Sequence, residues 1–175
     1  MLKSLFKSRP ALAAGRALYS AAVAQARTPA LYAEMAVPDT YEGRFEVYSL
    51  HVYLVLERLK DQGDQAAETA QACFDAYVQS LDDALREMGV GDLSVGRKMR
   101  KLGEAFYGRV RSCETAMAAL PERGPLEALL ARTVYAEQAN GAPERLADYL
   151  LAQRTALSVQ PLEGLLTGHA AWRAP

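Results

Sequence analysis

The chain of 175 residues carries 20 Lys and Arg against 21 Asp and Glu, so its formal net charge is only −1. Half of the residues are hydrophobic and 23% are charged, which is the composition of a folded globular protein and argues against disorder. The length fits one domain with a sizeable core. The near-zero net charge argues against a protein that coats DNA without specificity.

The cysteines and histidines are too scattered to suggest a metal site. Cys73 and Cys113 have no C-x-x-C spacing, and His51 and His169 are isolated. A zinc site needs a cluster of such ligands, so we expect neither a metal nor a cofactor. The cysteines are expected to be reduced thiols in the core of a protein from a reducing compartment.

The N-terminal segment is basic, because five cations precede the first acid, Glu34. This composition fits a mitochondrial transit peptide. It also fits a short basic arm, residues 1–10, that touches anionic lipid and leads into a structured helix. Composition alone does not decide between the two. No apolar run reaches the about 18 residues of a membrane-spanning helix.

Apolar residues recur at helical spacing along the chain, and glycines and prolines mark the boundaries between helices. Thr28 and Asp64 are expected to cap helices, and Gly89 to end one. The expected helices span residues 11–26, 29–36, 43–62, 65–88, 94–120, 125–139 and 143–158. One or two further turns follow Pro161, and Trp172 is placed to pack back on the body. The prediction is an all-α fold, a single-domain irregular helical bundle of about six to eight helices, with a helical domain over residues 11–160 and a C-terminal tail over residues 161–175.

The stretch GVGDLSVGRKMRK, residues 89–101, puts a glycine-rich turn directly before a cluster of cations. It is a near miss of the phosphate-binding pattern, because Arg97 and Lys98 stand where that pattern needs Lys and Ser or Thr. Between Arg86 and Arg111 there are seven basic and three acidic residues. The cluster is therefore either a solvated helix face or a docking surface for anionic lipid, nucleic acid or an acidic protein.

Groups suited to catalysis are not brought together by the sequence. A triad needs a base beside an activated nucleophile, whereas His51 stands among apolar residues and is expected to be an interior histidine. Asp82 and Asp83 are consecutive on a helix and point apart. We therefore expect a protein that is not an enzyme.

Three stretches carry a family likeness: VPDTYEGRFEVYSLHVYLVLERL (residues 37–59), FDAYVQSLDDALREMGVGDLSVGRKMRKLGEAFYGR (residues 74–109) and, more loosely, ALYSAAVAQARTPALY (residues 17–32). In them the chain resembles the ubiquinol–cytochrome c chaperone family, the assembly factors for cytochrome b of the respiratory bc1 complex. The short, alanine-rich chain is typical of an alphaproteobacterial member.

This resemblance implies a non-enzymatic chaperone that binds newly synthesised cytochrome b, a heme-carrying membrane protein, and promotes assembly of the bc1 complex. It implies a cytoplasmic protein at the inner face of the cytoplasmic membrane, or one in the mitochondrial matrix if the source is eukaryotic. An anionic membrane surface and the ribosome are further candidate partners, whereas DNA is not. The alternative is an RNA- or ribosome-associated binding module that uses the basic patch after Gly89.

Ten residues are candidates for binding the client. The helix over residues 43–62 is apolar on two faces and is therefore either central or the wall of a groove. Four candidates lie on this helix or just before it: Tyr41, Phe45, Tyr48 and Tyr53. Plain core packing is the equal alternative for these four. The other six belong to the turn after Gly89 and the helix that follows it: Asp92, Ser94, Arg97, Lys98, Lys101 and Arg109. Asp92 or Ser94 is expected to cap this helix, and Arg97, Lys98 and Lys101 are expected to face outward.

Overall fold

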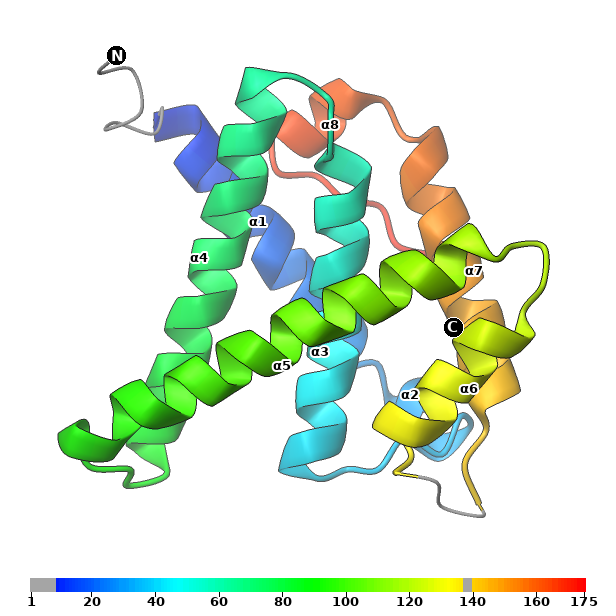
Figure 1. Cartoon of the computed structure of the whole chain (residues 1–175). Coiled ribbons are helices and arrows are strands. Elements are labelled where there is room, and N and C mark those ends of the chain that lie inside the picture. Colours follow the sequence, from blue (N-terminus) through cyan, green and yellow to red (C-terminus); the bar gives the residue numbers. More distant parts are fainter. Residues whose placement is uncertain (1–8, 137–139) are drawn as a thin grey trace.

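The computed structural model describes residues 9–136 and 140–175, and within these ranges the chain forms eight helices and no strand (Figure 1). The helices are α1 (Arg9–Ala26), α2 (Pro29–Ala33), α3 (Tyr41–Leu59), α4 (Asp64–Glu87), α5 (Asp92–Ala118), α6 (Gly124–Thr133), α7 (Pro143–Val159) and α8 (Leu162–Leu166). The predicted all-α fold is confirmed. Most of the basic arm, residues 1–8, and the predicted end of the sixth helix lie outside the described residues.

Helix α3 is the central element of the bundle. It is buried on both of its predicted faces, with Val47, Leu50 and Val52 each no more than 2% exposed. Helices α1 and α4 pack against it and against each other, and α5 crosses over α3 and α4 (Figure 1). Helices α6 and α7 pack together beyond the C-terminal end of α5. None of the described helices is both long enough and apolar enough to span a membrane.

The turn between α4 and α5 has the geometry predicted from Gly89. This glycine has a φ of 78°, its N–H donates to the carbonyl of Arg86, and the N–H of Val90 donates to the carbonyl of Leu85. These two bonds form the Schellman motif, which favours glycine because a side chain clashes at positive φ. Gly91, by contrast, has an ordinary φ of −64°.

Two of the predicted helix caps are wrong. Gly63, not Asp64, is the N-cap of α4, and Gly91 is the N-cap of α5, so neither Asp92 nor Ser94 holds that position. Thr28 is the N-cap of α2 as predicted, although its hydroxyl donates to the carbonyl of Gln25 and not to an N–H group of the helix. In each case a glycine or a competing backbone acceptor satisfies the local geometry without the predicted side chain.

The C-terminal segment packs back on the body as predicted. The ring centroid of Trp172 lies 5.4 Å from that of His51. Gln153 of α7 and Gln160, the residue that follows α7, hold the extended backbone around it. Gln153 accepts from the N–H of Arg173 and donates to its carbonyl, at 2.8 and 2.9 Å, and Gln160 bonds Ala171 in the same way.

Candidate protein-binding groove

A groove of about 800 Å³ opens between the C-terminal half of α3, α4 and α5. Its floor and walls are apolar and come from all three helices: Tyr53, Leu56, Ala67, Ala70, Phe74, Phe106, Tyr107, Val110, Met117 and Ala118. The groove exists because α5 crosses α3 and α4 at an angle, so that the helices diverge and leave an apolar surface that none of them covers (Figure 1). Such a surface is typical of a site for another molecule.

An aromatic cluster forms one wall of this groove. The ring centroid of Phe74 on α4 lies 5.3 Å from Phe106 and 5.8 Å from Tyr107, both on α5. Phe106 is 2% exposed, whereas Tyr107 is 58% exposed. The cluster therefore joins the core to the surface, and the Tyr107 ring is held in place by its neighbours while one side of it remains open.

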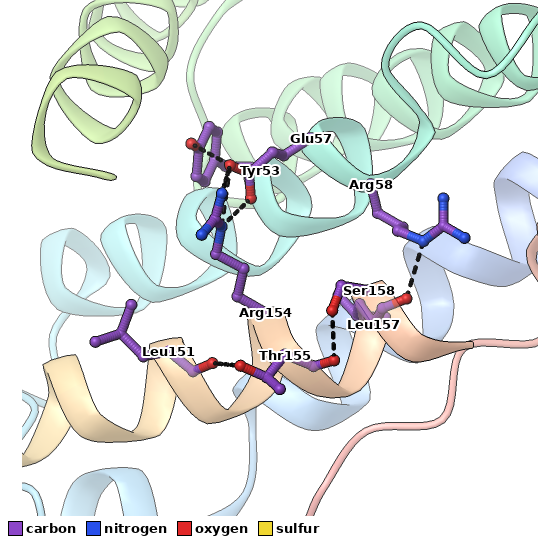
Figure 2. A network of polar contacts seen from close by, with 8 residues as sticks. All are labelled: Tyr53, Glu57, Arg58, Leu151, Arg154, Thr155, Leu157 and Ser158. Atoms are coloured by element: carbon purple, nitrogen blue, oxygen red, sulfur yellow. Dashed lines mark hydrogen bonds and ion pairs between the residues drawn. The ribbon is translucent and has the colours of Figure 1, made fainter. Parts of the chain in front are cut away.

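A polar network of α3 and α7 (Figure 2) borders the groove and forms part of its rim. Arg154 of α7 donates to both carboxylate oxygens of Glu57, at 2.9 to 3.1 Å, and the Tyr53 hydroxyl donates to the same carboxylate at 3.3 Å. Burial and the adjacent Glu57 raise the pKa of Tyr53, so its hydroxyl keeps the proton that it donates. Lys60 and Glu114, 2.9 Å apart, link α3 to α5 at the same rim. Charged groups thus border an apolar floor.

The four aromatic candidates on α3 do not form one surface. Tyr53 lines the groove although it is 3% exposed, and Phe45 belongs to a core cluster with Phe106 and Tyr77. Tyr48 is half-buried, and its hydroxyl accepts a hydrogen bond from Arg27 at 2.8 Å. Tyr41 is 38% exposed at the start of α3. Only Tyr53 is therefore brought to the groove.

The candidate residues on α5 also fall into two groups, one exposed and one buried. Arg97, Lys98, Lys101 and Ser94 are exposed, as the turn geometry predicted, whereas the side chain of Asp92 lies outside the described residues. Arg109, by contrast, lies mostly inside the bundle. Its guanidinium bonds both oxygens of Glu46 on α3, at 2.6 and 2.5 Å, and the two side chains are only 14% and 12% exposed. Arg109 holds α5 against α3.

Tyr53 is the one groove residue among the ten sequence candidates; the larger side chains Phe74, Phe106, Tyr107, Val110 and Met117 were missed. Phe74, Phe106 and Met117 lie at core positions of the helical periodicity, which predicts core packing and not a binding surface. Tyr107 carried the usable signal, because an aromatic residue directly after a core position turns away from the centre of the bundle. The groove itself depends on the angle between helices, which periodicity does not contain.

The buried titratable groups are poorly suited to catalysis. His51 is fully buried, with Nδ1 at 2.8 Å from the carbonyl of Val47 and Nε2 at 2.8 Å from the Tyr149 hydroxyl. Burial lowers the pKa of His51 to about 4, so the imidazole is neutral at physiological pH. Burial raises the pKa of Cys73 and of Cys113 to about 12, and a protonated thiol is a poor nucleophile. The described residues also contain no cluster of ligands that could hold a metal ion.

The chain therefore belongs to the class of single-domain all-α bundles, and its apolar groove, bordered by charged groups, has the form used in helix-in-groove recognition. The sequence identifies the family within this class. Residues 33–172 match the sequence model of the family described as ubiquinol–cytochrome C chaperone. The chain belongs to this family, and the resemblance seen in its sequence is confirmed.

Individual relatives agree with this assignment. The chain is 24% identical over 159 residues to ubiquinol-cytochrome-c reductase complex assembly factor 1 of Xenopus laevis, covering 89% of this chain and 78% of that protein. The mouse protein of the same name matches at the same identity, but the chain spans only 53% of its length. Among solved structures, the Cbp3 homolog from Brucella abortus is similar, with 34% sequence identity and a TM-score of 0.85 over 96% of this chain and 93% of that one.

Proposed function

We propose that this protein is a chaperone that binds a segment of newly synthesised cytochrome b in the groove between α3, α4 and α5, and so promotes assembly of the bc1 complex. Family membership supports the assembly role. The observation that carries the binding site is the groove itself, an apolar hollow of about 800 Å³ with Tyr107 58% exposed at its wall. A contiguous apolar hollow of this kind is typical of a surface that a partner covers.

The shape and chemistry of the groove suit an apolar helix. A helix that enters a groove presents residues at i, i+3, i+4 and i+7, and a segment of a membrane protein outside the bilayer has such residues uncovered. The Phe74–Phe106–Tyr107 wall would supply aromatic contacts, which give large contact area at low conformational cost. The charged rim, with Glu57, Arg154 and the Lys60–Glu114 pair, would contact the polar flanks of the segment and set its register.

Two exposed tyrosines allow a matched test. Tyr107→Ser removes an aromatic contact from the groove wall, and Tyr41→Ser removes the exposed tyrosine at the start of α3, outside the groove. We expect Tyr107→Ser to reduce the amount of cytochrome b that co-purifies with the protein from cells, and Tyr41→Ser to leave it unchanged. Thermal unfolding of both variants checks that the fold is intact.

The reverse pattern would contradict the proposal. If Tyr41→Ser reduces co-purification and Tyr107→Ser does not, the client binds at the start of α3 instead of in the groove. Equal and unchanged co-purification in both folded variants would also remove the aromatic wall from client binding.

A further inference from the structure

The N-terminal half of α5 carries four exposed cations within five positions, Arg97, Lys98, Arg100 and Lys101, and Arg111 follows three turns later. Within residues 9–136 and 140–175, none of the five has an ion pair or a side-chain hydrogen bond. Six other cations of the described body have acidic partners: Arg44, Lys60, Arg86, Arg109, Arg123 and Arg154. The protein therefore pairs many of its cations internally but leaves these five on α5 available.

These five residues, the cationic face of α5, occupy the outer side of the helix. Residues three, four and eleven positions apart lie on one side of an α-helix, and Arg97, Arg100, Lys101 and Arg111 follow these spacings. Phe106 and Cys113, which are 2% and 0% exposed, mark the opposite, inward side. Glu104 is the single acid among them on the outer side.

We propose that the cationic face of α5 docks on the surface of an anionic phospholipid bilayer. Several Lys and Arg residues on one exposed helix face are attracted by the negative surface potential of such a bilayer. Side chains that suit the interface flank the cations. Met88, in the turn before α5, is 54% exposed, and Tyr107 is 58% exposed with its polar end free to reach the headgroup region.

The same surface is less suited to single-stranded RNA. Proteins that bind RNA strands through a basic surface use several aromatic side chains on which successive bases stack. Along the described part of α5, Tyr107 is the one exposed aromatic residue, and its ring already packs against Phe74 and Phe106. A bilayer needs only a row of cations on an outward face, which is what α5 provides.

Lipid docking would also place the groove beside the membrane. Tyr107 lines the groove on one side and, on the other, a shallow hollow that it shares with Arg100 and Arg111. The groove and the cationic face are therefore neighbouring surfaces of one helix. A client segment leaving the bilayer would meet the groove directly. This last step rests on the proposed function, whereas binding to lipid does not.

The test is flotation of the purified full chain with vesicles that contain no protein. We expect binding to vesicles of phosphatidylcholine with 30 mol% phosphatidylglycerol, none to phosphatidylcholine alone, and release at high salt. The variant Arg97→Gln/Lys98→Gln/Lys101→Gln should bind the anionic vesicles on the order of a hundredfold more weakly. Its matched control, Arg16→Gln/Arg132→Gln/Arg173→Gln, loses the same charge at exposed positions elsewhere and should bind like the parent.

Each other outcome overturns the proposal. Equal loss in both triple variants would show a general charge effect, and full binding by the α5 variant would place the lipid contact elsewhere on the chain. If the protein does not bind anionic vesicles but binds an oligouridine strand through the α5 cations, the partner is nucleic acid. If the parent protein fails to bind the anionic vesicles while cytochrome b capture is intact, lipid docking alone is refuted and the groove assignment is unaffected.

Discussion

The closest approach between two helices gives the sharpest prediction about the fold. Gly15 of α1 faces α4, and a Cβ atom at this position would lie 2.5 Å from the Cβ of Ala72, 2.6 Å from the backbone nitrogen of Cys73 and 2.7 Å from the carbonyl oxygen of Thr69. None of these atoms belongs to a flexible side chain. Gly15→Ala must therefore push α1 away from α4.

The net effect combines two opposing contributions. Alanine stabilises a helix interior by about 1 kcal/mol relative to glycine, whereas overpacking in a rigid core costs roughly 1–3 kcal/mol and more where backbone must move. We expect the free energy of unfolding to fall by about 2 kcal/mol, which lowers the Tm by roughly 4–8 °C in a chain of this size.

Gly108→Ala is the matched control. Gly108 lies in α5, and no atom within 4 Å would contact its added Cβ, so the gain in helix propensity should appear alone and raise the Tm by about 2–4 °C. Differential scanning calorimetry of both variants measures the two shifts. If Gly15→Ala is neutral or raises the Tm, α1 and α4 are not in the close contact described.

Three further predictions follow from buried groups and backbone geometry. The pKa of His51 is about 4 in the folded protein and about 6.5 in the unfolded chain. The contribution of the neutral, buried His51 to the free energy of unfolding is therefore complete above pH 6.5, and this stability is lost as the pH falls to 4. Urea unfolding should show that the free energy of unfolding falls by about 3 kcal/mol over this pH interval, and His51→Gln should abolish this loss. An equal loss in that variant would exclude His51 as the cause. Arg109→Met leaves Glu46 unpaired and should lower the free energy of unfolding, measured with urea, by roughly 2 kcal/mol, because both side chains keep some solvent contact. Arg109→Met/Glu46→Leu should recover part of this loss. No loss in the single variant would show that the ion pair does not hold α5 on α3. Gly89→Val forces a branched residue to a φ of 78° and should lower the Tm by roughly 4 °C, so an unchanged Tm would contradict the turn geometry.

Much of the fold could be predicted because its determinants are local. Helical periodicity located α3 and its two apolar faces, and Gly89 predicted the turn before α5. Caps were less predictable: Gly63 takes the position predicted for Asp64, because a glycine with φ 93° already satisfies the geometry there. A cap depends on one backbone conformation, whereas a helix is supported by a pattern repeated over many residues.

The site was harder to predict because it depends on distances between helices. The exposure of Arg97 and Lys98 follows from the periodicity of α5 itself. The pairing of Arg109 with Glu46 does not, since the two residues are 63 positions apart in sequence. The groove arises where α5 crosses α3 and α4, so its residues come from three separate stretches, and the periodicity of each stretch does not show how the stretches meet.

The most direct measurement of the central claim is site-specific photo-crosslinking in cells, with the probe placed at Tyr107 or Ala118 in the groove, and at Tyr41 as a control outside it. Both groove positions have exposed side chains, so a probe there can reach a bound segment without disturbing the core. If the groove binds the client, we expect capture of cytochrome b from Tyr107 and Ala118 and none from Tyr41. Capture from Tyr41 alone, or of ribosomal components in place of cytochrome b, would contradict it.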